Sequence, residues 1–63
     1  MIKKGDFVDT PRFCKVEIEK VFTSRETAAR QGFREPTHYQ GSGYEILGKH
    51  TDSNHMIFAA VKR

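Results

Sequence analysis

The segment GYEILGKH, residues 43 to 50, comes closest in this chain to a motif with recognisable chemistry. Gly43, Gly48 and Lys49 match the fixed positions of the phosphate-binding loop G-x-x-x-x-G-K-[ST]. His50 replaces the serine or threonine that binds magnesium, and the residues between the glycines are large and favour strands. The motif also needs a preceding strand and a following helix, which the flanking residues do not predict. We expect no nucleotide binding, and we interpret Gly48 as a strand bulge or a close packing contact.

The histidines are the residues most suited to a metal ion. His50 and His55 flank the turn TDSN, so we expect them to face each other across the neck of a hairpin, with Asp52 in the turn. Two histidines and a carboxylate can hold zinc or another divalent ion. The ligand spacing matches no tight site and no cysteine pair is present. We therefore expect surface residues and no cofactor, with a metal-binding domain as an alternative.

The segment EPTHYQ, residues 35 to 40, is predicted to be a loop, because Pro36 restricts the residue before it and a Gly-Ser-Gly turn signal follows. Loops carry binding residues more often than strands do. The alternative is that the segment only packs against the sheet. As an interaction site this loop would use Glu35, Thr37, His38 and Tyr39.

Basic residues along the middle of the chain form a candidate nucleic-acid surface. Clustered cations contact phosphates, and an aromatic ring stacks on a base. Three glutamates interrupt the set, and basic residues late in a helix also complement its dipole, so a solvated face is the alternative. The candidate residues are Arg25, Arg30, Arg34, Lys49 and Tyr39.

No residue pattern supports catalysis. Paired carboxylates, a Ser/His/Asp order and a Cys/His arrangement are not recognisable, and a sheet of this size offers little concave pocket. Cys14, the only cysteine, is expected to be a small buried residue. We expect a chain that is not an enzyme.

Five elements would position these residues. Alternation of apolar and polar side chains predicts strands at residues 14 to 22 and 44 to 50. Residues 6 to 9 are predicted as a short edge strand, and the apolar run from residue 56 to 61 as a central strand. Residues 24 to 31 are predicted to be helical.

The helix has signals at both ends. Thr23 and Glu26 form a capping box that satisfies backbone N–H groups at the start. Gly32 suits the left-handed stop at the end, and Phe33 behind it folds back toward Ala28.

These elements predict an α+β fold with a three- to four-stranded antiparallel sheet, one short helix, the order β-β-α-β-β, and the C-terminal strand in the centre. The helix covers one face of the sheet. Only Phe7 and Phe13 are available to cover the other face, so apolar residues left open there would favour a dimer.

Length and charge restrict the possible classes. The chain has 63 residues and forms one small domain, residues 1 to 63. Its net charge of +3 permits anionic partners, including DNA or RNA, without requiring them. The N-terminus lacks the apolar run of a signal peptide, and no segment is apolar for long enough to span a membrane. A lone thiol fits a reducing compartment, so we expect a cytoplasmic protein without membrane contact.

The chain resembles small uncharacterised proteins of bacterial mobile elements. The resemblance rests on the run KKGDFVDTPRFCKVEIEKVF, on the later GF, EPTHY and YEILGKHT, and on FAAVK near the end, and it covers nearly the whole chain. It implies a short accessory protein of a plasmid, phage or conjugative element, and it implies no catalytic residues.

The sequence thus favours a small non-enzymatic binding module that acts through protein–protein contact or self-association. In a mobile element it would be an accessory regulator or an inhibitor of a host-defence complex. A small basic nucleic-acid-binding protein is the first alternative, and a metal-binding domain is the second.

Overall fold

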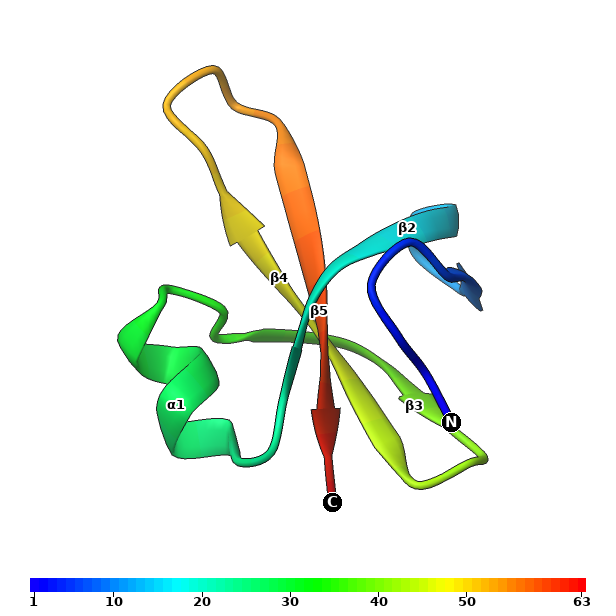
Figure 1. The fold of residues 1–63 in the computed structure, drawn as a ribbon. Coiled ribbons are helices and arrows are strands. Elements are labelled where there is room, and N and C mark those ends of the chain that lie inside the picture. The colour runs from blue at the N-terminus through cyan, green and yellow to red at the C-terminus, as the bar shows by residue number, and fades with distance from the viewer.

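A computed structural model describes all 63 residues (Figure 1). The chain forms one short helix and five strands, and the bounds of its second and fourth strands are those predicted from alternation. In chain order the elements are β1 (Phe7–Thr10), β2 (Cys14–Phe22), α1 (Arg25–Arg30), β3 (Glu35–Gln40), β4 (Tyr44–His50) and β5 (Met56–Lys62).

All five strands lie in one mixed sheet, with the order β1-β2-β5-β4-β3. β2 and β5 are parallel, and the other neighbouring pairs are antiparallel. The predicted α+β fold with a three- to four-stranded antiparallel sheet and the order β-β-α-β-β is therefore wrong. β5 lies in the middle of the order, between β2 and β4, which is the place predicted for the C-terminal strand.

The error arises at residues 35 to 40, which form β3 and not a loop. Each hairpin reverses the chain, so one additional strand inverts the direction of every later strand relative to β2. This makes β5 parallel to β2. Pro36 is tolerated because β3 is an edge strand, where a missing N–H breaks no inner ladder. The register shift between Pro36 and His38 marks a bulge beside it.

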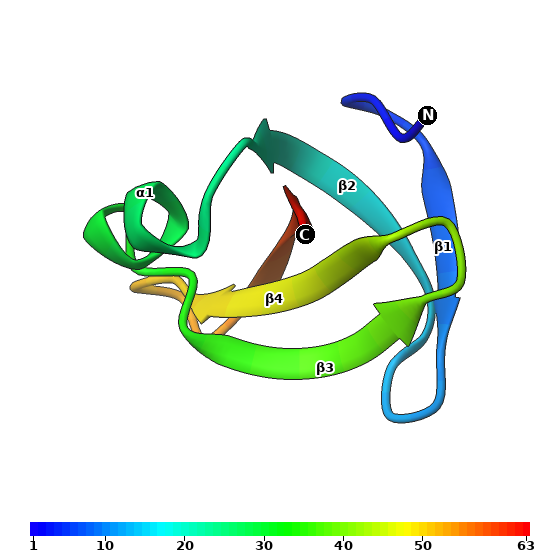
Figure 2. The same cartoon turned by 90° about the horizontal axis from the view of Figure 1, so that it is seen from below.

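The sheet curls, so that its strands enclose a concave side and α1 lies outside (Figure 2). A second register shift, between Ile18 and Lys20 of β2, adds to the right-handed twist that strands already have. Buried side chains fill the concave side. This concave cluster contains Ile2, Val8, Val16, Ile18, Tyr44, Ile46, Phe58 and Ala60.

The outer side of the central strands is also buried, because α1 and Phe33 cover it. Small residues at Ala28 and Ala59, both fully buried, let the helix approach the sheet closely. This helix-side cluster contains Ala28, Phe33, Leu47, Ala59 and Val61, with Phe22 and Ile57 packed against it.

Both faces of the central strands are thus covered, and the predicted open apolar face does not exist. The sheet face opposite the helix is covered because the sheet curls, which brings β1 and Ile2 over the concave side. The exposed large apolar residues, Phe7, Val21 and Tyr39 among them, come from different strands. Self-association stays a prediction, but no open apolar sheet face supports it.

The helix begins one residue later than the capping box required. Ser24, not Thr23, is the N-cap, and its hydroxyl accepts the Thr27 N–H at 3.3 Å. Gly32 has a φ of +92° at the C-terminal end, as the predicted left-handed stop requires. The Phe33 N–H then donates to the Ala28 C=O at 3.0 Å, which confirms the predicted return of Phe33 onto the helix.

The structure also tests the roles predicted for Gly48 and Cys14. Gly48 is a close packing contact: a Cβ there would lie 2.9 Å from the Met56 Sδ. Cys14 is exposed, so the prediction of a buried thiol is wrong. It closes the tight turn between β1 and β2, where its φ is +59°.

Candidate functional site

The surface has one open, shallow depression, which lies between the N-terminal segment and the end of β2. Residues 2–4 line one flank and residues 19–22 line the other. Its volume is about 510 Å³ and it is open to solvent. We call this depression the β2 slot. A volume of this size accommodates several side chains, which is the range of ligand sites.

The slot exists because the N-terminal segment leaves β2 before that strand ends. β1 pairs with β2 only as far as Glu17. The Gly5 N–H donates to the Ile18 C=O at 2.8 Å, and the Ile18 N–H donates to the Asp6 C=O at 2.9 Å. A turn then diverts the chain, with the Asp6 N–H donating to the Lys3 C=O at 3.1 Å and Gly5 at a φ of +92°. Figure 1 shows the N-terminal segment running away from β2 beyond this turn.

Beyond Ile18, one edge of β2 is therefore unpaired. Residues 20–22 pair with β5 on the opposite edge, and no backbone hydrogen bond joins residues 1–4 to residues 19–22. Side chains of both orientations line the slot, because Val21 aligns with Ala60 of the concave cluster while Phe22 aligns with Val61 of the helix-side cluster. The slot thus follows the strand edge and not one face of the sheet.

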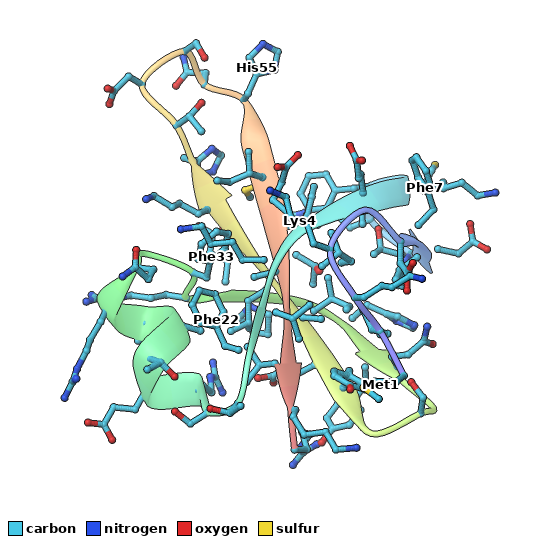
Figure 3. All side chains as sticks on the ribbon, viewed as in Figure 1. Met1, Lys4, Phe7, Phe22, Phe33 and His55 are labelled. Carbon is cyan, nitrogen blue, oxygen red and sulfur yellow. The ribbon has the colours of Figure 1, made fainter.

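The slot combines an apolar floor with a basic rim. Ile2 is buried, Phe22 is half-buried, and Val21 is 40% exposed although it is a large apolar residue. The charged side chains on the rim are exposed, and Lys4 lies next to β2 in Figure 3. They are Lys3, Lys4 and Lys20, with Glu19 as the only acidic group.

The predicted nucleic-acid residues lie around α1, where acidic partners neutralise part of their charge. Arg25 forms an ion pair with Glu45 at 3.4 Å, and Arg30 with Glu26 at 2.9 Å. Arg34 donates from Nε to the Ala29 C=O at 3.2 Å. These contacts hold three predicted residues around the helix, but only Arg34 lacks an acidic partner.

Lys49 and Tyr39 flank this helix region on the same side of the sheet. The Lys49 Nζ lies 5.8 Å from the centre of the Phe33 ring, so the lysine covers the core residue behind α1. Tyr39 pairs across the strands with Glu45, the residue that binds Arg25.

Arg63 is a further cation in this region, and its guanidinium lies 4.0 Å from the centre of the half-exposed Tyr39 ring. We call the five cations around α1 the basic face. Two of these five cations form ion pairs, with Glu45 and Glu26, so three have no acidic partner. The basic face consists of Arg25, Arg30, Arg34, Lys49 and Arg63.

The histidines do not meet as predicted. His50 pairs with Met56 in the register of β4 and β5, so His55 lies one step further out, at the exposed hairpin tip (Figure 3). Asp52 is exposed in the same turn, and His38 lies in β3 opposite Ile46. No group of three or more His, Cys, Asp or Glu side chains is placed to hold a metal ion.

The predicted interaction loop is instead an edge strand, so its side chains alternate in direction. Glu35 and Tyr39 are exposed, whereas Thr37 and His38 are half-buried. The Thr37 hydroxyl donates to the Ile46 C=O at 3.0 Å and so links β3 to β4. The four residues do not form a common surface.

The β2 slot was not found from the sequence. Two local signals were present: the break in alternation at Val21 and Phe22, and the glycine after two lysines in KKGD. The first marks the bulge between Ile18 and Lys20, and the second marks the turn that separates the N-terminal segment from β2. Their proximity depends on the sheet topology, which no local pattern encodes.

Comparison with family models, with curated proteins and with solved structures finds no match to this chain. α1 is the only helix, and with six residues it is too short to cross a membrane.

Proposed function

We propose that this chain is a non-enzymatic binding module whose partner is another protein held at the β2 slot. The observation that carries the proposal is the unpaired edge of β2 over residues 19–22, next to an exposed apolar side chain. Unpaired strand edges pair readily with other chains, and protein interfaces place apolar side chains inside a polar rim. The slot has both features.

The residues that line the slot support binding better than catalysis. The slot holds lysines, one glutamate and apolar residues, and no histidine, cysteine, serine or threonine lines it. A nucleophile and a base within hydrogen-bond reach are what covalent catalysis needs. The slot offers contact area and charge instead, which suits an accessory protein that acts by occupying a partner's surface.

A site-specific photo-cross-linker tests this proposal. A benzophenone amino acid at position 20 is expected to form a covalent adduct with one protein in an extract of the source cells. The same probe at position 53, at the exposed hairpin tip, is the matched control and should form none. Excess unlabelled protein should suppress the adduct, and nuclease treatment should leave it intact. Equal labelling from both positions, or no protein adduct, contradicts the proposal.

Nucleic-acid binding is the second candidate, and the basic face favours it. Arg34, Lys49 and Arg63 have no acidic partner, and Tyr39 presents a ring that a base can stack on. The ion pairs at Arg25 and Arg30 leave this surface with less free charge than the sequence suggested. We therefore rank it below the β2 slot.

The basic face makes a quantitative prediction for single-stranded DNA. If it binds a labelled oligothymidine, replacing Arg34, Lys49 and Arg63 with glutamine should lower the slope of log affinity against log salt by about 2, at ~0.7 per lost phosphate contact. Replacing Arg12, Lys15 and Lys62 changes the net charge equally and should leave the slope unchanged. Fluorescence anisotropy measures both. Absence of binding at low salt, or binding that salt does not weaken, removes this candidate.

A further inference from the structure

We infer that the β2 slot binds an extended acidic peptide segment, which adds to the sheet as a strand along the free edge of β2. This inference rests on the proposed function and names the chemistry of the partner. Its side chains would alternate between acidic residues, directed to the lysines, and apolar residues, directed to Val21 and Ile2.

The backbone of β2 has hydrogen-bonding groups on this edge that no other segment of the chain uses. The ladder on this edge runs from Cys14–Thr10 through the Ile18–Asp6 bond and then stops, although β2 itself continues to Phe22. The strand is held extended there by β5 on the other side. A peptide in the slot would continue the ladder that β1 begins, with no rearrangement of the sheet. Strand addition to an ordered edge gains main-chain hydrogen bonds at low conformational cost.

The side chains that line the slot indicate the composition of the partner. An added strand beside β2 places its alternate side chains next to Lys20 on one face and next to Val21 on the other. Lys3 and Lys4 stand on the far flank of the slot, so carboxylates on the incoming strand would have cations on both sides. Apolar side chains on the other face would cover Val21 and meet Ile2, which is already part of the concave cluster.

The same charges disfavour a second copy of this chain as the occupant. Two slots brought edge to edge would place six lysines against two glutamates, and like charges across paired strands are destabilising. Lysines at strand edges are a known protection against self-pairing. The other free edges are less suitable, because β3 carries Pro36, which has no N–H to donate, and no depression borders β1.

A short capped peptide of alternating glutamate and valine tests the inference, with the full chain as receptor. We expect it to bind at least about tenfold more tightly than the same peptide with lysine in place of glutamate, measured by fluorescence anisotropy at physiological salt. Hydrogen exchange at the amides of residues 19–22 should slow in the complex, whereas the exposed hairpin tip should be unaffected. Equal affinity for both peptides overturns the inference.

Backbone methylation separates strand addition from simple charge attraction. Amide N–H groups of glutamates point to one edge of the peptide strand and those of valines to the other. Methylating one set should abolish binding, while methylating the other should leave it intact. Equal effects of the two modifications overturn strand addition.

The peptide test and the cross-linking test can fail separately. If the cross-link from position 20 forms while the glutamate–valine peptide fails to bind, the chain is a protein-binding module with a different partner chemistry. If lysines serve only to protect the edge, Lys20→Gln should promote self-association and no peptide should bind.

Discussion

Replacing Phe33 with alanine is expected to unfold most of the protein at 25 °C. Phe33 is 1% exposed and fills the space between α1 and the sheet, where its ring centre lies 5.6 Å from that of Phe22. Removing a buried phenylalanine costs about 3–5 kcal/mol, because the transfer energy is lost and a cavity remains. A domain of this length has a total stability of only about 3–5 kcal/mol. The single change therefore removes most of the free energy of unfolding.

Phe7 provides the matched control for this prediction. It is the same residue type in the same sheet, but it is 64% exposed, so Phe7→Ala should change the free energy of unfolding by no more than about 0.5 kcal/mol. Phe33→Leu should stay folded, since it retains most of the apolar volume. Urea unfolding followed by far-ultraviolet circular dichroism measures all three. A Phe33→Ala midpoint close to that of the unchanged chain would show that the helix-side cluster does not hold the domain together.

The sequence predicts elements well where local chemistry determines them. Alternation alone located β2 and β4, and the apolar run located β5 as the central strand. Gly32 and Phe33 correctly located the end of the helix, because a left-handed residue and a returning aromatic ring are local requirements. The start of the helix was predicted one residue too early, since Thr23 and Ser24 are both good caps and only the backbone conformation selects between them.

The sequence fails where one segment's structure depends on its neighbours. Residues 35 to 40 contain a proline and polar residues, which indicate a loop, and they form a strand because β4 supplies a partner edge. That one error reversed the predicted direction of β5 relative to β2 and left the concave side without cover. Once β3 is present, the sheet has five strands and can curl, so β1 and Ile2 close over the concave cluster.

The candidate site was beyond sequence reasoning for a related physical reason. Lys3, Lys4 and Lys20 are ordinary exposed charges in the sequence, and Val21 is an ordinary strand residue. They become a site only because the turn at Gly5 separates two segments that the β1–β2 hairpin would otherwise have paired. A strand edge is free only where no neighbouring strand pairs with it, and a local sequence pattern does not show which edge lacks a partner.

Reversing the charge of the three slot lysines is expected to exchange the peptide preference of the protein. With Lys3→Glu, Lys4→Glu and Lys20→Glu, the glutamate–valine peptide should bind at least about tenfold more weakly, because each exposed attraction of ~0.2–1 kcal/mol becomes a repulsion of similar size. The lysine–valine peptide should gain affinity in the same variant. Such an exchange requires that the charges contact the peptide, since a folding defect would weaken both.

A second triple variant distinguishes local contact from net charge. Arg12→Glu, Lys15→Glu and Lys62→Glu alter the net charge by the same amount, and all three residues are exposed and lie outside the slot. This variant should keep the preference for the acidic peptide, because distant charges are screened beyond about 8–10 Å. Its modest loss of affinity should shrink at higher salt.

Anisotropy titrations of both variants with both peptides form the complete test. If the two variants lose the acidic peptide equally, overall charge explains the binding, and the lysines around β2 have no specific role. If only the slot variant exchanges its preference, the recognising groups are those that the turn at Gly5 places beside the free edge of β2.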